Sequence, residues 1–173
     1  GVARRGDPIL QPGHMDGGRT PRDVIGKLAE FVPFQFSATG YPNLVDAAIA
    51  QVARTGAIRE IRILGVAPAG VNPRIRRGQL VQKVGRTTDY TTGVVRDVHY
   101  RLALHYQKTA TTKGRAGLRD QVLCSRYTAG GDSGSAVLDS RKRLVGLHFA
   151  GSPSTSIFNK IQNVFTALDI ELA

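Results

Sequence analysis

The chain has 173 residues, 41% of them hydrophobic and 21% charged, and its 24 Lys and Arg against 13 Asp and Glu give a net charge of +11. This composition is sufficient for a buried core and argues against disorder, and no apolar run is long enough to span a bilayer. The single cysteine, Cys124, excludes an internal disulfide framework and, without a recognisable signal peptide, favours a cytoplasmic location.

The first 31 residues predict a loop followed by a helix. Residues 1–19 are rich in glycine and proline, with a short edge segment at 8–10. Thr20 is a typical helix N-cap, Pro21 suits the first helical position, and Asp23 lies in the first turn. The next apolar residues at helical spacing are Val24, Ile25, Leu28 and Phe31, so a short helix is expected in this half of the chain.

From residue 34 onward the pattern is that of short strands. Between Val94 and Gln107 most even positions are apolar and most odd positions polar, which predicts a long strand with one buried face. Shorter apolar runs predict strands at 34–36, 58–64, 80–84, 122–127, 135–138 and 143–149, and helical spacing over 159–168 predicts a C-terminal helix. Short strands, Gly and Pro turns and little helix indicate an all-β barrel or sandwich.

One segment carries a chemical signature, the run Gly130-Gly131-Asp132-Ser133-Gly134-Ser135. Glycines let the backbone turn sharply, so that a serine in the turn exposes its hydroxyl while successive N–H groups point at one spot. The N–H groups of Gly131 and Ser133 would then form an oxyanion hole. The alternative is a glycine-rich turn without chemical meaning.

The residues after the serine motif extend the pattern. An apolar strand and a short basic turn lead into Leu144–Ser152, which contains Val-Gly-Leu-x-x-x-Gly, and then into the predicted C-terminal helix. This order resembles the second barrel of chymotrypsin-like serine proteases. The resemblance implies a mostly β fold of two antiparallel barrels, with residues 1–75 as the remainder of an incomplete first barrel and 76–173 as the second. It also implies that Ser133 is the nucleophile of an endopeptidase working through an acyl-enzyme.

Two further segments resemble parts of the same family. The run Asn43–Ala50 is similar to the short motif around the triad aspartate, which implies that Asp46 holds and stabilises the catalytic histidine. Taken alone, this run favours a helix turn with Asn43 or Asp46 as its cap. Residues 85–93 resemble a Thr- and Gly-rich hairpin of bacterial and plant intracellular members, although Asp89 stands where many of them carry Gly.

The histidine of the triad is harder to assign. The order in this family is His, Asp, Ser, and only His14 precedes Asp46, in a Pro/Gly loop unlike the family's strand-ending histidine motif. His99 and His105 fall on the polar face of the long predicted strand. We therefore expect the catalytic histidine in an N-terminal segment upstream of Gly1, so that the chain alone would lack its base; His14 as an unconventional base is the alternative.

The positions that line the specificity pocket in this family point to acidic substrates. Tyr127, six residues before the serine, would form the pocket base and disfavours Lys or Arg. Thr128 and His148 resemble the residues with which glutamyl endopeptidases bind a carboxylate, and Gly151 would line the open wall. The net charge of +11 would also steer acidic peptides. The alternative is a pocket for a small apolar side chain.

Two other function classes remain open at this point. One is a catalytically dead protease fold used for binding. The other is a basic nucleic-acid-binding module, although its basic clusters lie in predicted turns and no aromatic-basic pattern accompanies them. Neither a metal nor an organic cofactor is expected, because the four histidines are scattered and no phosphate-binding or dinucleotide motif is present. Cys124 falls in an apolar strand and is expected in the core.

Overall fold

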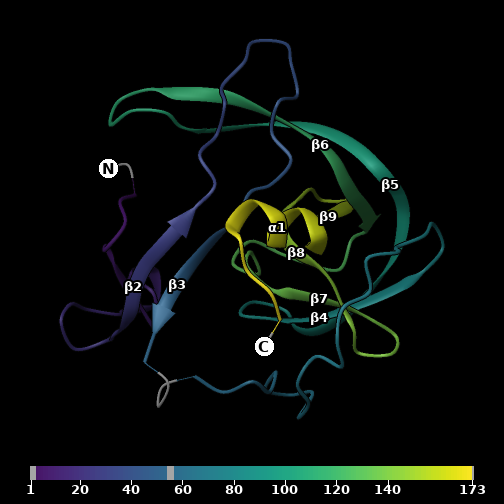
Figure 1. The fold of residues 1–173 in the computed structure, drawn as a ribbon, viewed down its shortest axis with the longest axis horizontal. Helices are drawn as coiled ribbons and strands as arrows, with labels where there is room; N and C mark the ends of the chain where they lie inside the picture. The colour runs from purple at the N-terminus through teal and green to yellow at the C-terminus, as the bar shows by residue number, and fades with distance from the viewer. Residues whose placement is uncertain (1–2, 54–56, 173) are drawn as a thin grey trace.

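The computed structural model describes residues 3–53 and 57–172 and shows a mostly β protein with a C-terminal helix (Figure 1). Its elements are β1 (Pro8–Leu10), the 3-10 helix η1 (His14–Asp16), β2 (Val24–Phe31), β3 (Ala48–Val52), β4 (Leu80–Gly85), β5 (Asp89–Gln107), β6 (Lys113–Ser125), β7 (Ala136–Asp139), β8 (Leu144–Gly151), β9 (Thr155–Lys160) and α1 (Ile161–Leu168). Within the two described ranges, no helix is long and apolar enough to cross a membrane.

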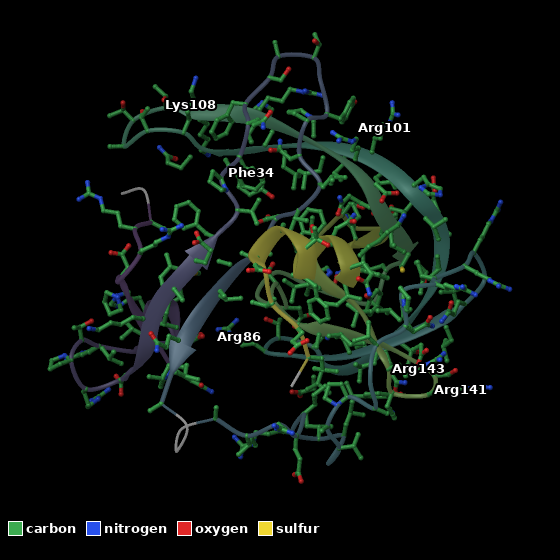
Figure 2. The ribbon with its side chains drawn as sticks, viewed as in Figure 1. Phe34, Arg86, Arg101, Lys108, Arg141 and Arg143 are labelled. Atoms are coloured by element: carbon green, nitrogen blue, oxygen red, sulfur yellow. The ribbon has the colours of Figure 1, made fainter. Side chains whose placement is uncertain are left out.

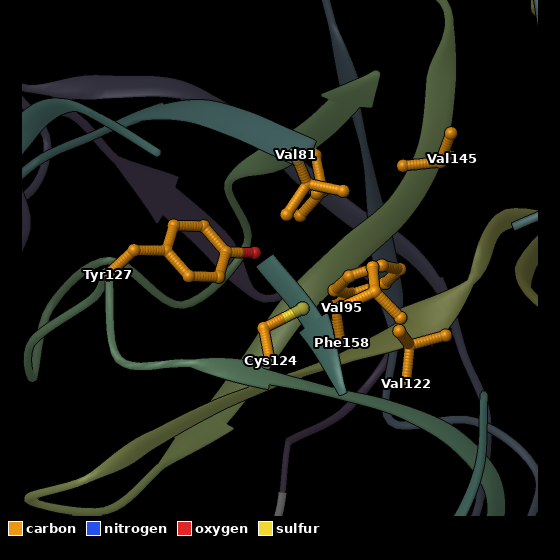
Figure 3. Packing of buried hydrophobic residues seen from close by; sticks show 8 residues of the cluster. Val81, Val95, Val122, Cys124, Tyr127, Val145 and Phe158 are labelled. Atoms are coloured by element: carbon orange, nitrogen blue, oxygen red, sulfur yellow. The ribbon is translucent and has the colours of Figure 1, made fainter. Parts of the chain in front are cut away.

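Six antiparallel strands form a closed barrel in the order β4-β5-β6-β9-β8-β7, with β7 pairing back onto β4. Closure leaves no unpaired edge in the ring. The barrel is filled by a cluster of fully or nearly fully buried side chains (Figure 3): Val81, Val95, Val122, Cys124, Tyr127, Val137, Val145 and Phe158. Cys124 lies in the core, as predicted, and burial raises the pKa of its thiol to about 12.

Ahead of the barrel lies a small sheet in the order β1-β2-β3, to the left of the barrel in Figure 1. The helix predicted after Thr20 is wrong, because residues 20–23 form a turn and β2 comes next. In that turn the Asp23 carboxylate accepts the Arg19 N–H at 2.7 Å. Val24 and Leu28 share one face in a helix and in a strand alike, so their spacing does not separate the two. A Cβ at Gly26 would lie 2.4 Å from the Gln51 carbonyl oxygen, which shows how closely β3 approaches β2.

A second cluster of apolar side chains joins α1 to the outside of the barrel. It contains Val45, Ala47, Leu138, Leu144, Ile161, Val164 and Leu168. The predicted C-terminal helix is therefore confirmed, and its apolar face covers the barrel. Because Val45 and Ala47 belong to this cluster, the segment that connects β2 to β3 packs against the barrel.

The other predicted strands have mixed outcomes. The five predicted between 80 and 149 are confirmed as β4 to β8 with shifted ends, whereas 34–36 and 58–64 contain no strand. Ile58 is 72% exposed and Ile63 is 65% exposed, so no second sheet layer supports that segment. Neither β3 nor β9 has a signal in the sequence, because both are short and depend on pairing with strands far along the chain. The mostly β architecture is confirmed.

The distal halves of β5 and β6 form a long hairpin arm that reaches over residues 34–43. Arg115 donates to the carbonyl oxygens of Ser37 and Gly40, and Arg119 donates to those of Tyr41 and Pro42. Part of the high arginine content is thus used in internal contacts. Figure 2 shows the labelled basic residues on the arm, beside β4 and at the turn between β7 and β8, so they are not gathered on one face.

Candidate active site

Ser133 lies in the turn between β6 and β7, and its side chain is exposed. Directly after the serine, the turn is hydrogen-bonded to β8, because the Gly134 N–H donates to the His148 carbonyl oxygen at 2.8 Å. Gly131 and Gly134 have φ angles of +101° and +86°, which glycine adopts far more easily than other residues. The only hydrogen bond of the Ser133 hydroxyl in the described part of the chain is a long one, 3.4 Å to the Phe149 carbonyl oxygen.

The same turn leaves backbone N–H donors unused on both sides of Asp132. The N–H groups of Asp132 and Ser135 are satisfied by carbonyl oxygens within the turn. Those of Gly131 and Ser133 have no hydrogen-bond partner among the described residues. A Cβ at Gly131 would lie 2.3 Å from the Thr87 hydroxyl oxygen, so this position has room only for glycine. The arrangement leaves two donors beside the serine hydroxyl, as an oxyanion hole requires.

Asp132, next to the nucleophile candidate, fixes the turn through its buried carboxylate. Its carboxylate is 0% exposed and accepts hydrogen bonds from the backbone N–H groups of Thr87, Thr88 and Ala129 and from the Thr88 hydroxyl. These bonds outweigh burial and hold the pKa of the Asp132 carboxyl well below its ordinary value. Lys83, also 0% exposed, places its Nζ 3.3 Å from the carboxylate.

The tight turn between β4 and β5 supplies most of those donors. It is the Thr-rich hairpin singled out in the sequence, and Asp89 within it has a φ of +47°. Glycine adopts this left-handed conformation most easily, which fits the Gly that many related hairpins carry there. The hairpin thus supports the serine turn through Asp132.

Asp46 is attached to the barrel through its backbone. The buried Asn159 amide accepts the Asp46 N–H and donates to the Asp46 carbonyl oxygen, both at 2.9 Å. The Tyr106 hydroxyl donates to one carboxylate oxygen at 2.5 Å, and the Tyr106 ring stacks on Phe34 with centroids 4.2 Å apart. Burial raises the pKa of the Asp46 carboxyl, while the Tyr106 hydrogen bond opposes that rise.

A cavity of about 680 Å³ has both Asp46 and Ser133 in its lining, and we call it the Asp46 cavity. His105 and Tyr106 also line it, although the sequence placed His105 on a solvated strand face. His14 is not among the residues that line the cavity; its Nδ1 lies 3.0 Å from the Gly18 carbonyl oxygen. On the surface, the His99 Nδ1 lies 2.7 Å from the Asp120 Oδ1. The structure thus places the Asp46 carboxyl and the Ser133 hydroxyl at the same cavity.

Ser133 also borders a second cavity of about 580 Å³, which we call the Thr128 cavity. Its lining includes Thr128, His148 and Gly151, as expected, together with Arg126 and Pro153, which the sequence analysis did not single out. The side chain of Tyr127 does not line it. A Cβ at Gly93 would lie 2.4 Å from the Tyr127 ring, so the absence of a side chain at Gly93 gives this ring its place in the barrel core (Figure 3).

Two polar side chains of the Thr128 cavity, Thr128 and His148, are buried. The Thr128 hydroxyl lies 2.6 Å from the hydroxyl of Ser156, which accepts the Tyr127 N–H at 3.0 Å. His148 is 3% exposed, and its Nδ1 has no hydrogen-bond partner in the described residues. Burial lowers the pKa of its imidazole to about 4, against the raising effect of Asp132. The cavity therefore contains polar side chains to which a ligand could hydrogen-bond.

Comparison with known proteins is consistent with this geometry. The family model described as Trypsin matches residues 35–170. Among solved structures, Cellulomonas bogoriensis chymotrypsin is 18% identical, with a TM-score of 0.64, covering 98% of this chain and 89% of that one. Thermobifida fusca protease A is 15% identical, with a TM-score of 0.63 and coverage of 86% and 74%.

A third similar structure is described as a glutamic acid specific serine protease that uses a histidine triad in substrate binding. It is 20% identical, with a TM-score of 0.59, and covers 91% of this chain and 76% of that one. At these identities the likeness concerns the fold. A search of curated proteins finds no match.

Proposed function

Because the chain belongs to the trypsin family of serine proteases, whose substrates are peptides or proteins, we propose that Ser133 is its nucleophile. One observation carries the proposal: the exposed Ser133 hydroxyl borders both the Asp46 cavity and the Thr128 cavity, beside the unused N–H groups of Gly131 and Ser133. The hydroxyl would attack the peptide carbonyl, and the two N–H groups would stabilise the negative oxygen of the tetrahedral intermediate. Collapse to an acyl-enzyme releases the amine, and water then frees the acid.

The acid of this proposal is Asp46, held against the barrel by Asn159. One of its carboxylate oxygens accepts from Tyr106, and the other makes no hydrogen bond within the described residues. That second oxygen would accept an imidazole N–H, fixing the tautomer of a histidine that takes the Ser133 proton. We assign this histidine to a segment outside residues 1–173, since none of the chain's four histidines has both the motif and the contact with Asp46.

A fluorophosphonate that labels activated serines tests the nucleophile in the full-length native protein. The wild type and Ser140→Ala, which removes an exposed hydroxyl from the β7–β8 turn, should be labelled, and Ser133→Ala should not. Equal labelling of Ser133→Ala would refute the assignment. His14→Ala and His105→Ala should retain peptide cleavage; loss of activity by about a thousandfold or more in either variant would place the base inside the chain.

For the residue before the cleaved bond, we propose a preference for an acidic side chain. The Ser156 hydroxyl oxygen accepts the Tyr127 N–H, so the Ser156 hydroxyl can donate its own proton to the Thr128 oxygen. In that arrangement the Thr128 hydroxyl proton is free to be donated to a carboxylate oxygen in the cavity. The glutamic-acid-specific protease among the similar structures, with its substrate-binding histidines, supports the same preference. Peptides that differ only in Glu, Gln, Ala or Lys at this position test it. Cleavage fastest after Glu is expected, and cleavage fastest after Lys would contradict it.

A further inference from the structure

An acidic side chain in the Thr128 cavity would bring a negative charge among groups that are mostly neutral. Thr128 and Ser156 are uncharged, and His148 is buried at 3% exposure. Because burial lowers the pKa of His148 to about 4, its imidazole is neutral near pH 7 and adds no charge unless it first takes up a proton. Neutral donors orient a carboxylate but do not replace the hydration that an ionised group loses on entering a pocket.

The cavity nevertheless contains one permanent cation, Arg126. This residue directly follows β6 and lines the Thr128 cavity together with Thr128 and Ser133. Its guanidinium donates a long hydrogen bond, 3.3 Å, to the carbonyl oxygen of Pro153, which lines the same cavity from the turn between β8 and β9. The Arg126 side chain therefore joins two segments of the cavity lining.

The charge of Arg126 is not matched by any acid in the described part of the chain. No carboxylate there lies within salt-bridge distance of it, whereas Arg143 pairs with Asp139 and Arg86 with Asp16. A guanidinium carries five N–H donors in a planar fork that fits a carboxylate. With one long bond to a carbonyl oxygen, Arg126 retains donors for a ligand.

We propose that Arg126 supplies the fixed positive charge that recognises the ionised carboxylate of an acidic residue before the cleaved bond, an inference that rests on the acidic preference proposed above. In this arrangement Thr128 donates to the carboxylate and Arg126 balances its charge. The pocket then selects Glu over its neutral isostere Gln, a discrimination that hydrogen bonding alone would not produce.

The test compares two peptides that differ only in Glu or Gln before the cleaved bond, using full-length native protein. Arg126→Gln should lower the Glu:Gln ratio of kcat/KM by about 10- to 100-fold, as expected for loss of a charge-assisted bond. Arg126→Lys should keep part of the ratio. Arg141→Gln, which removes an equal charge from an exposed turn, should leave the ratio unchanged. Because the two peptides are cleaved by the same sample, a partly unfolded variant does not distort the ratio.

The outcomes separate the two proposals. If the wild type prefers Glu and Arg126→Gln keeps the full Glu:Gln ratio, the role of Arg126 is wrong and the acidic preference stands. An equal fall for Arg126→Gln and Arg141→Gln also overturns the inference, since overall charge would then be responsible. If the wild type shows no preference for Glu over Gln and Ala, the acidic preference fails and the role of Arg126 fails with it.

Discussion

The closed barrel and the three-stranded sheet differ in how completely their strands are covered. Every barrel strand is hydrogen-bonded on both sides, and the barrel encloses side chains such as Val81, Val122 and Phe158 at 0% exposure. In the sheet, β1 and β3 are edges, and Leu28 is the single buried side chain of β2, at 8% exposure. The barrel thus has a hydrophobic core of its own, whereas the sheet contributes little to the burial of apolar surface.

This difference bears on the active site, because every candidate catalytic group is fixed by the barrel. Ser133 is anchored through Asp132 and Lys83, and both the Asp46 cavity and the Thr128 cavity are lined largely by β8 and neighbouring turns. Asp46 precedes β3 in the chain, yet Asn159 at the end of β9 holds its backbone. The geometry around the serine should therefore respond strongly to changes in the barrel and weakly to changes in the sheet.

The largest effect is expected when the buried ion pair under the serine turn is broken. Lys83→Met leaves the fully buried Asp132 carboxylate without a counter-ion, which should lower the free energy of unfolding by about 3–5 kcal/mol and reduce kcat through a disordered Ser133 turn. Urea unfolding measures the change in the free energy of unfolding, and peptide hydrolysis measures the change in kcat. Lys113→Met, an exposed site at the start of β6, is the matched control and should change stability little. A Lys83→Met protein as stable as this control would show that the pair is dispensable.

A smaller effect should appear as a pH dependence that comes from His148. Its pKa in the folded protein, about 4, lies below the ordinary value of 6.5. The unfolded chain therefore takes up a proton first as the pH falls, so this contribution to stability is complete above about pH 6.5 and is lost toward pH 4. Between pH 7.5 and 4.5 the loss should be about 2–3 kcal/mol.

Urea titrations at several pH values test this, with His148→Gln expected to lose less stability on acidification than the wild type. The exposed His105→Gln is the control and should keep the wild-type pH dependence. If His148→Gln destabilises with acid as steeply as the wild type, other groups control the acid response of the barrel.

Detaching Asp46 from the barrel should have a moderate effect, seen mainly in catalysis. Asn159→Ala removes the amide that bonds to both the N–H and the carbonyl of Asp46, so kcat should fall by about 10- to 100-fold with KM nearly unchanged. Asn163→Ala, on the next turn of the chain in α1, should leave kcat intact. An equal loss in both variants would point to general destabilisation rather than to the position of Asp46.

The smallest effect is expected in the sheet. Val52→Ala, at the end of β3 where the valine is 38% exposed, should change the free energy of unfolding by less than about 0.5 kcal/mol. The same substitution at the fully buried Val122 of the barrel should cost about 2 kcal/mol. Thermal or urea unfolding of the two variants gives a direct comparison. Similar losses in the free energy of unfolding would mean that the side chains of the sheet are packed as tightly as those of the barrel.

The elements that could be predicted are those whose signals are local. The serine turn depends on the consecutive glycines around Asp132 and Ser133, and α1 has its apolar stripe within one short segment. The predicted helix at 24–31 failed because Val24 and Leu28 share one face in a strand as well as in a helix, and only the pairing with β3 decides between the two. Tyr127 was misplaced for a related reason: its ring fits into the barrel because Gly93, on another strand, has no side chain.

The sequence alone predicted a mostly β chain with a glycine-framed Ser133, because turn residues and alternating apolar positions are local features of the chain. The serine protease family followed from the resemblance of its motifs, which the family match over residues 35–170 supports. Tertiary structure decided what surrounds that serine: Lys83 under Asp132, Tyr106 on Asp46, and Arg126 facing the turn that holds Pro153. The partners in each case lie far apart in sequence and meet only through strand register and barrel closure, which no local pattern encodes.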